Sequence, residues 1–269
     1  APPPTATEPV RVRLRPGREK ALLAGHPWLF AGGIADESGS PDAALARVER
    51  SDGRLVGTGF YSPRSQVRVR MVTRDERPVD GPLFARRLAD AAALRAALIP
   101  ADTDGYRVLN AEGDDLPGWT IDRYGGAFPG QTIFHLGSSA ARRGEGLSGA
   151  DEPIVGELPP EVRFRESGFE FSAEVGGQKT GFYCDQRENR RMVERLAGGR
   201  TVLDLFAHGA AFSVYALRGG ATRATALEAA PRLREVADRT IRENGLEAAR
   251  FEGLTADVFA DLRERTDRY

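Results

Sequence analysis

The segment from Thr201 to Ser213 constrains the fold of this chain more than any other. Its first six residues, Thr-Val-Leu-Asp-Leu-Phe, are typical of a buried strand, and a loop of small residues, Ala-His-Gly-Ala-Ala, follows. A helix pattern comes next, and Glu228 stands at the end of the following apolar run. A strand, a small-residue loop, a helix and a later acid are together typical of a nucleotide-type cofactor site on an α/β sheet.

Strand and helix patterns alternate through the last third of the chain. Strands are expected at 201–206, at 224–227 and around Phe251 and Leu254. Helices are expected from Asp185, where Glu188 completes a capping-box pattern, to Leu196, at 211–217, and from Pro231 onward. This alternation predicts a parallel sheet. Only 56 residues follow Ser213, fewer than a complete doubly wound domain needs.

Three acids, Asp204, Glu228 and Asp257, lie at or near the ends of the expected strands, where open parallel sheets bind ligands. Each alone could be a helix N-cap, but three together favour ligand binding. Glu228 follows Asp204 by 24 residues, near the roughly 20-residue spacing of a ribose-binding acid. The loop is not Gly-x-Gly-x-x-Gly, which argues against NAD and permits S-adenosylmethionine, a ligand without a pyrophosphate.

A second unusual stretch, residues 176–190, crowds glycines and polar side chains at the start of a helix, where backbone amides attract ligands. The alternative is a rigid interdomain turn. Lys179 favours a function, because all of the 38 basic residues except Lys20 and Lys179 are arginines. The one cysteine, Cys184, is close to this helix start, but we favour a structural, buried role for it because no partner base is identifiable.

Residues 10–75 are expected to form a small β-rich domain. Strands are predicted at 10–14, 46–50, 55–60 and 67–72, with a short helix at 18–23 and a turn at Asp52-Gly53. The alternation in 67–72 places Arg68 and Arg70 on one face, which fits a solvated strand face and a phosphate-contacting strand equally well. Residues 1–75 carry 12 Lys/Arg and 8 Asp/Glu, a balance compatible with nucleic-acid binding.

The middle of the chain is predicted to contain an amphipathic helix at 82–99, a strand, acidic turn and strand at 106–124, a loop-rich region at 125–168 and a strand at 169–175. Residues 1–9 are expected to be a disordered lead-in. The absence of a long apolar run argues against a membrane protein. A single cysteine excludes an intrachain disulfide and favours a reducing, cytoplasmic location, and three histidines without cysteine partners do not indicate a metal site.

Four stretches of the sequence, at 25–30, at 110–125, at 177–187 and from Val202 onward, resemble a known family. They are Gly-His-Pro-Trp-Leu-Phe, Asn-Ala-Glu-Gly-Asp-Asp-Leu-Pro-Gly with Asp-Arg-Tyr-Gly, Gly-Gln-Lys-Thr-Gly-Phe-Tyr-Cys-Asp-Gln-Arg, and Val-Leu-Asp-Leu-Phe. They are similar to the PUA-domain-containing class I S-adenosylmethionine-dependent RNA methyltransferases, especially the bacterial large-subunit ribosomal RNA cytosine-5 methyltransferases.

The resemblance implies an α/β fold in three parts. These are a PUA β-barrel-like RNA-binding domain at 10–75, a shortened central α+β domain at 82–175, and the N-terminal part of a Rossmann-like methyltransferase domain at 176–269. It implies S-adenosylmethionine as cofactor and ribosomal RNA as partner. Glu228 would hold the ribose hydroxyls and Asp257 would approach the adenine amine. The cofactor residues that it implies are Lys179, Thr180, Phe182, Asp204, Phe206, Ala207, Gly209, Phe212, Glu228 and Asp257.

The chain also departs from the family pattern. Ala210 and Ala211 stand where the family usually has two glycines, and the region 127–150 is shorter than usual. The chain ends at Tyr269, before the family's Asp-Pro-Pro strand and catalytic cysteine, and Cys184 does not align with that cysteine. We therefore expect no catalytic residue in this chain and no activity from it alone.

Two alternative functions stay open at this point: an RNA-binding protein that has lost catalysis, and a methyltransferase acting on another base such as guanine. An incomplete sheet would leave an apolar edge strand open, so poor solubility or a homodimer is expected.

Overall fold

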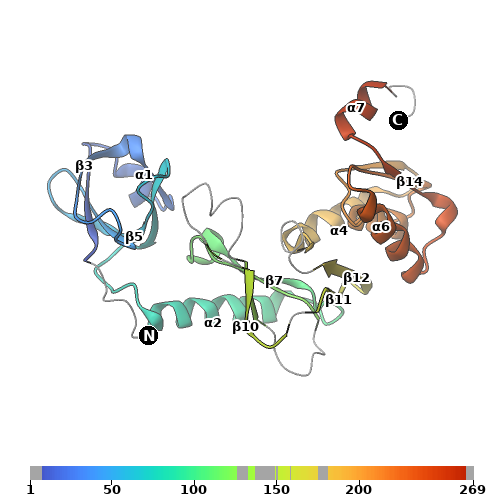
Figure 1. Cartoon of the computed structure of the whole chain (residues 1–269), viewed down its shortest axis with the longest axis horizontal. Coiled ribbons are helices and arrows are strands. Elements are labelled where there is room, and N and C mark those ends of the chain that lie inside the picture. Colours follow the sequence, from blue (N-terminus) through green and yellow to red (C-terminus); the bar gives the residue numbers. More distant parts are fainter. Residues whose placement is uncertain are drawn as a thin grey trace. The chain divides into compact units, whose positions relative to one another are not determined.

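The computed structural model describes residues 8–125, 133–136, 149, 151–157, 159–174 and 181–264 (Figure 1). The chain divides into two compact units, which we describe separately. The first comprises Ala1–Ile99, Val108–Ile121 and Phe134–Ile154, and the second comprises Pro100–Arg107, Asp122–Ile133 and Val155–Tyr269. In the described ranges, no helix has both the length and the apolar character needed to cross a lipid bilayer.

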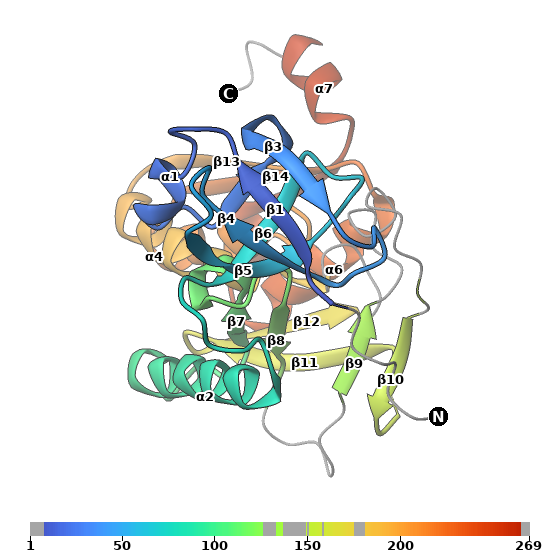
Figure 2. The ribbon, with the colours of Figure 1, turned by 90° about the vertical axis from the view of Figure 1, so that its left-hand side faces the viewer.

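The first unit begins with a six-stranded sheet in the order β2-β6-β5-β4-β1-β3 (Figure 2). β1 and β4 are parallel, and the other neighbouring pairs are antiparallel. The strands are β1 Val10–Leu14, β2 Trp28–Phe30, β3 Ile34–Ser38, β4 Leu45–Glu49, β5 Leu55–Tyr61 and β6 Val67–Thr73, with helix α1 at Lys20–Leu23 and the 3-10 turn η1 at Ala31–Gly33.

Alternating burial builds the core of this sheet, as the sequence predicts. In β1, Val10, Val12 and Leu14 are buried while the two arginines between them are exposed. The strands predicted near β1, β4, β5 and β6, the short helix and the turn at Asp52-Gly53 are confirmed. β2 and β3 were missed, because one has only three residues and the other buries only its first residue.

The contacts of two arginines in β6 bear on the two interpretations of this strand face. Arg68 Nη1 donates to both carboxylate oxygens of Glu37 at 3.1 Å, and Arg70 Nη1 donates to Ser62 Oγ at 3.2 Å. These contacts within the sheet favour the structural interpretation of the two arginines. Gly59 of β5 also has a packing role, because a Cβ there would collide with the backbone carbonyl of Arg70.

Helix α2, Gly81–Leu98, confirms the predicted helix, and the Asp80 carboxylate caps it by accepting from Leu83 N at 3.0 Å. Leu83 and Ala91 are buried, whereas Leu88, Leu94 and Leu98 on the predicted apolar stripe are exposed. β7 Tyr106–Asn110, the 3-10 turn η2 Ala111–Asp114 and β8 Thr120–Arg123 confirm the predicted strand, acidic turn and strand.

The prediction of a loop-rich region at 125–168 is wrong for part of its length. β9 Ile133–Leu136 pairs with β10 Asp151–Val155, and β11 Glu161–Glu166 pairs with β12 Phe169–Glu174 in an antiparallel hairpin. The alternation in β11, with Val162, Phe164 and Glu166 buried, was obscured by the prolines and glycines that precede it. Residues 126–132 and 137–148, where the predicted shortening falls, lie outside the described residues.

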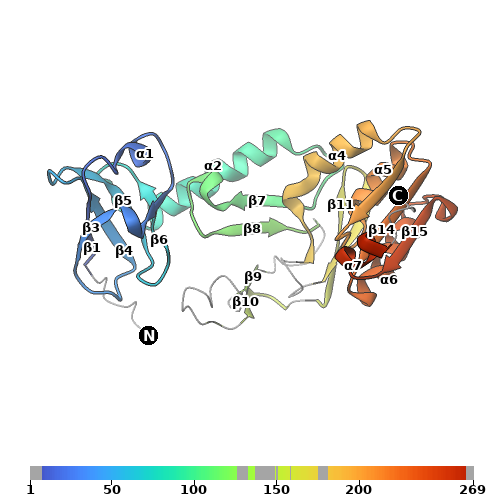
Figure 3. The same cartoon turned by 90° about the horizontal axis from the view of Figure 1, so that it is seen from above.

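The second unit contains a three-stranded sheet in the order β13-β14-β15, and its parallel pairing confirms the predicted parallel sheet. Helix α5 packs on β13 and β14, and helix α6 packs on β14 and β15 (Figure 3). The elements are α4 Arg187–Leu196, β13 Thr201–Leu205, α5 Ala211–Arg218, β14 Arg223–Glu228, α6 Pro231–Glu243, the 3-10 turn η5 Ala248–Arg250, β15 Phe251–Thr255 and α7 Val258–Glu264. The expected association of an open edge stays a prediction.

The predicted capping box at Asp185 and Glu188 is wrong. Residues Cys184–Gln186 form a 3-10 turn, η4, and α4 begins at Arg187 without a side-chain cap. The Asp185 carboxylate instead pairs with Arg107 Nη1 at 3.3 Å. A charged partner from 78 residues earlier in the chain therefore replaces the local helix cap.

A buried ion pair joins the β11-β12 hairpin to the helices of the second unit. Arg190 on α4 donates from Nε and Nη2 to the two oxygens of Glu166 at 2.8 and 2.7 Å. The two side chains are 1% and 0% exposed, so both charges are removed from water. The Tyr215 hydroxyl on α5 donates to Glu166 Oε1 at 3.0 Å, which satisfies the carboxylate further.

Candidate functional site

The loop between β13 and α5 has an unusually strained backbone. Phe206, His208 and Ala210 have φ values of 55°, 49° and 57°, and these are half of the non-glycine residues with positive φ in the described part of the chain. The left-handed conformation costs an L-residue about 1–2 kcal/mol, and such strain is concentrated at functional sites. Ala207 N donates to Leu227 O at 3.0 Å, which ties the strained loop to the neighbouring strand.

Glu228, at the end of β14, holds this loop in place. Its Oε2 accepts from His208 N at 3.0 Å, and its Oε1 accepts from Ala230 N at 3.2 Å. One carboxylate therefore joins the loop after β13 to the loop after β14. Each carboxylate oxygen has two lone-pair sites, so this partly buried group can still accept hydrogen bonds from a ligand.

Asp204 connects β13 to the start of α5. Its Oδ2 accepts from Ser213 N at 3.1 Å and from Ser213 Oγ at 2.8 Å, and the carboxylate is buried. Burial raises the pKa of Asp204 to about 6, against the opposing effect of the Ser213 hydrogen bonds. Asp204 is thus a positioning residue that fixes the helix below the strained loop.

The raised pKa of Asp204 predicts how stability depends on pH. Because the folded-state pKa of about 6 exceeds the ordinary value of 3.8, the carboxyl proton stabilises the fold at low pH, and this contribution is lost as pH rises through about 6. Relative to Asp204→Asn, the wild-type chain should lose up to about 3 kcal/mol of stability between pH 4 and pH 7. Unfolding free energies measured across this pH range test the prediction. Asp90→Asn, at an exposed site on α2, is the control and should keep the pH dependence of the wild type. If the stability of Asp204→Asn changed with pH as steeply as that of the wild type, the prediction would be contradicted.

An exposed ring of the strained loop lies close to an exposed ring of α7. Phe206 and Phe259 are 59% and 61% exposed, and their ring centroids are 5.6 Å apart. Asp257 is exposed beside them and caps α7, since its Oδ1 accepts from Ala260 N at 2.8 Å. The structure therefore gathers Phe206, Glu228 and Asp257 at the carboxyl edge of the sheet. Phe259 was not identified from the sequence, because only its exposure distinguishes it from a core residue.

The remaining predicted residues are distributed differently. Ala207 and Gly209 belong to the strained loop itself. Phe182 is buried in the aromatic core, with its ring centroid 4.8 Å from that of Phe164. Arg190 lies over the rings of Phe182 and Phe212, at 4.7 and 5.7 Å from their centroids. Lys179 and Thr180 lie outside the described residues.

Tyr183 links the buried ion pair to the strained loop, a role that the sequence did not reveal. Arg190 Nη2 donates to Tyr183 O at 3.0 Å, and the Tyr183 ring meets the His208 ring edge-on at 5.7 Å. Burial lowers the pKa of His208 from its ordinary value, against the attraction of Glu228, so the imidazole is neutral near pH 7.

Cys184 has the environment of a structural cysteine. Its side chain is buried in the core of the second unit. Burial, and next the charge of Asp122, raise the pKa of the Cys184 thiol far above its ordinary value. A thiol that stays protonated is a poor nucleophile, because the thiolate is the reactive form.

Two family models match the chain. A PUA-like domain model matches residues 12–74, and an S-adenosylmethionine-dependent methyltransferase model matches residues 146–265. A putative SAM-dependent methyltransferase from Streptococcus mutans has the same fold, with a TM-score of 0.76 and 22% identity over 95% of this chain and 73% of that one. A putative methyltransferase in complex with SAH also gives a TM-score of 0.76, at 22% identity over 95% of this chain and 72% of that one. The expected fold class is thereby confirmed.

Two curated relatives are similar over most of their length. The Ribosomal RNA large subunit methyltransferase I of Klebsiella pneumoniae is 36% identical over 96% of this chain and 72% of its own. The Ribosomal RNA large subunit methyltransferase of Deinococcus radiodurans is also 36% identical, over 96% of this chain and 72% of its own. The chain therefore belongs to the large-subunit ribosomal RNA methyltransferase I family, and it combines a PUA-like domain with an S-adenosylmethionine-dependent methyltransferase domain.

Proposed function

We propose that this chain serves the methylation of carbon 5 of a cytosine in large-subunit ribosomal RNA. In this proposal, residues 10–75 contact RNA and residues 176–269 bind the methyl donor. The observation that carries the proposal is the Glu228 carboxylate, which two backbone amides hold at the end of β14 beside the strained loop. The names of the curated relatives support the RNA substrate.

The residues at the carboxyl edge fit S-adenosylmethionine. Glu228 would accept hydrogen bonds from the ribose hydroxyls with its remaining lone pairs. The exposed rings of Phe206 and Phe259 would pack on the adenine, and Asp257 would accept from the adenine amine. When bound, the donor supplies an activated methyl group on a sulfonium centre.

The other expected contacts are part of the same proposal. Ala207 and Gly209 would bring the loop backbone close to the donor, because neither has a bulky side chain. Phe182 and Phe212 would support the pocket indirectly, through Arg190. Lys179 and Thr180 are proposed as contacts on the resemblance alone.

Methylation at carbon 5 of cytosine requires a nucleophile that this chain does not present. Carbon 5 becomes reactive when a thiolate adds to carbon 6, and a base later removes the carbon 5 proton as the thiolate leaves. Cys184 is the single cysteine among the 269 residues, and burial keeps it protonated. We therefore propose that these 269 residues bind the donor without transferring its methyl group to carbon 5.

This proposal predicts no incorporation of label when the 269-residue chain is incubated with methyl-labelled donor and unmethylated large-subunit ribosomal RNA. Cys184→Ala should bind the donor within about twofold of the wild-type affinity, because the thiol contacts the core rather than the carboxyl edge. Calorimetric titration measures the affinity. Label on cytosine carbon 5 that disappears in Cys184→Ala would make Cys184 the nucleophile and overturn the proposal.

The identity of the methylated base and of the RNA substrate is tested in the organism that carries the gene. Deletion of the gene should remove one 5-methylcytidine from the large-subunit ribosomal RNA, as mapped by mass spectrometry. Loss of a different methylated base would favour the alternative of another target atom. Unchanged ribosomal RNA would contradict the methylation proposal and favour an RNA-binding protein without catalysis.

A further inference from the structure

The imidazole of His208 stands in the strained loop between β13 and α5, where the proposed function places the methyl donor. The backbone of His208 has a φ of 49°, and its N–H donates to Glu228 Oε2 at 3.0 Å. The half-buried ring meets the Tyr183 ring edge-on, with the two ring centroids 5.7 Å apart. The loop and Tyr183 therefore hold the imidazole in a defined position, close to the carboxylate that is proposed to bind the ribose.

The ring nitrogens of His208 are available to a ligand. In the described part of the chain, neither nitrogen has a hydrogen-bond or ion-pair partner, whereas the backbone N–H of the same residue is bonded to Glu228. Polar groups that serve only the fold are ordinarily hydrogen-bonded within it. The nitrogens lie instead in a loop at the carboxyl edge of a parallel sheet, where such sheets bind ligands.

The charge of His208 depends on the groups around it. Burial lowers the pKa of its imidazole from the ordinary value of 6.5, and the Glu228 carboxylate opposes this effect. The ring is therefore neutral near pH 7 and gains a proton only in acid. In the described ranges, the elements around the loop contribute the titratable or charged groups Asp204 of β13, Tyr183 before η4, Arg190 of α4, Glu228 of β14 and Arg232 of α6. Both arginines form ion pairs with glutamates of the β11-β12 hairpin.

The methyl donor and its product differ by one charge. The sulfur of S-adenosylmethionine is a sulfonium cation, whereas the sulfur of the demethylated product, S-adenosylhomocysteine, is neutral. In both molecules the sulfur is bonded to carbon 5 of the ribose, which is the group proposed to lie at Glu228. The sulfur and a charge at His208 then lie within about one Debye length, roughly 10 Å at 0.1 M salt, so screening does not remove their interaction.

We propose that His208 determines whether this site prefers the cationic donor or the neutral product. A neutral imidazole leaves the preference for the donor intact, whereas an imidazolium repels the sulfonium and not the neutral sulfur. Protonation therefore shifts the preference toward the product, and by linkage donor binding and protonation of His208 oppose each other. This inference deepens the proposed function, on which it rests for the placement of the ribose at Glu228.

Calorimetric titration of the 269-residue chain with each of the two molecules, from about pH 8 to about pH 5, tests this proposal. The quantity compared is the ratio of the two dissociation constants. In the wild type, this ratio should move toward the product by about 2- to 15-fold as the pH falls, the range for unit charges about 10 Å apart at effective dielectric constants of about 80 to 20. In His208→Gln, which has no titrating ring, the ratio should stay constant. A purely structural role of His208 would change both affinities alike.

A permanent charge at this position tests the sign of the effect. His208→Lys carries a cation at about pH 8, where the wild-type imidazole is neutral. At that pH it should show the preference for the product that the wild type shows only in acid. Melting temperatures measured without ligand check that both His208 variants are folded.

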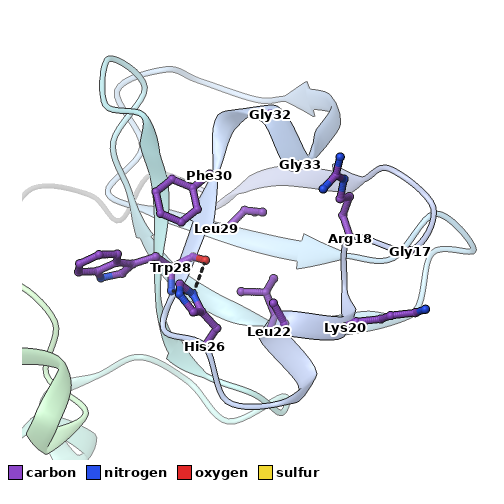
Figure 4. Close-up of a pocket in the computed structure, with 11 residues that line it drawn as sticks. Gly17, Arg18, Lys20, Leu22, His26, Trp28, Leu29, Phe30, Gly32 and Gly33 are labelled. Carbon is purple, nitrogen blue, oxygen red and sulfur yellow. Dashed lines mark hydrogen bonds between the residues drawn. The ribbon is translucent and has the colours of Figure 1, made fainter.

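Two controls separate His208 from other titrating groups. His26 belongs to the first unit, where its Nδ1 lies 3.0 Å from Trp28 O (Figure 4), and His26→Gln should keep the pH-dependent ratio of the wild type. Asp204 has a pKa of about 6 and loses its negative charge over the same pH range. Asp204→Asn should nevertheless keep the pH dependence of the ratio. Loss of that dependence in Asp204→Asn would assign the effect to Asp204 and contradict the proposal.

A wild-type ratio that is the same at both ends of the pH range, or a ratio that still shifts with pH in His208→Gln, would overturn the role of His208 and leave the donor site standing. Failure of the wild-type chain to bind either molecule at any pH would contradict the proposed donor site, and this inference with it. The failure of this inference is therefore distinguishable from failure of the proposed function.

Discussion

Replacing Arg190 by methionine is expected to lower the free energy of unfolding by about 3–5 kcal/mol, the largest stability effect that the structure predicts. The substitution leaves the Glu166 carboxylate buried with its charge uncompensated, at a side chain that is 0% exposed. The contacts of Arg190 with Tyr183 O and with the Phe182 and Phe212 rings are lost as well. Denaturant unfolding followed by far-ultraviolet circular dichroism measures the change.

Two further variants make this prediction specific. Arg191→Met, at the neighbouring and exposed position of α4, should change stability by less than about 0.5 kcal/mol. Arg190→Met combined with Glu166→Leu should recover most of the loss, because it removes both charges from the core. If the double variant were as unstable as the single one, shape rather than charge would explain the effect.

The second large effect concerns the donor. Glu228→Gln should weaken the binding of S-adenosylmethionine about 10- to 150-fold, since a hydrogen bond to a charged group contributes about 1.5–3 kcal/mol. A glutamine also turns an N–H group toward either His208 N or Ala230 N, both of which are donors. Calorimetric titration with the donor and with its demethylated product measures the affinity.

Position and charge can be separated at this residue. Glu228→Asp keeps the charge but shortens the side chain, so it should lose affinity and the contact with the loop together. The matched control is Glu235→Gln on the exposed surface of α6, which should bind like the wild type. Wild-type affinity in Glu228→Gln, with an unchanged melting temperature, would contradict the role of Glu228 in donor binding.

Local patterns predicted the elements that depend on local properties. β13 and β14 were recognised because short, mainly apolar segments, Thr-Val-Leu-Asp-Leu and Arg-Ala-Thr-Ala-Leu-Glu, alternate with helix patterns, as the strands of a parallel sheet do. The hairpin turn was recognised from the Asp52-Gly53 pair, and in the structure Gly53 adopts a φ of 84°, which glycine favours. The three acids at the strand ends were found for the same reason, since alternating strands and helices make the strands parallel and bring their carboxyl ends to one edge of the sheet.

Contacts between residues far apart in the chain determined the features that local sequence patterns did not predict. Asp185 pairs with Arg107 instead of capping α4, and Glu166 pairs with Arg190 across 24 residues of chain. Single-residue spacing carries no information about such pairs, because they depend on which segments fold side by side. The hairpin of β11 and β12 was missed in part for this reason. Glu166 is a charged residue, which a sequence pattern assigns to the surface, and it is buried in the structure because Arg190 pairs with it.

The sequence by itself determined the order of strands and helices in the methyltransferase part, the positions of Asp204, Glu228 and Asp257, and the family. Only the tertiary structure decided how the site is held. The left-handed conformations of Phe206, His208 and Ala210 are disfavoured locally, and they persist where Glu228 from the next strand binds the loop. The physical reason is that local propensity sets which elements form, whereas contacts between distant residues compensate for strain and buried charge.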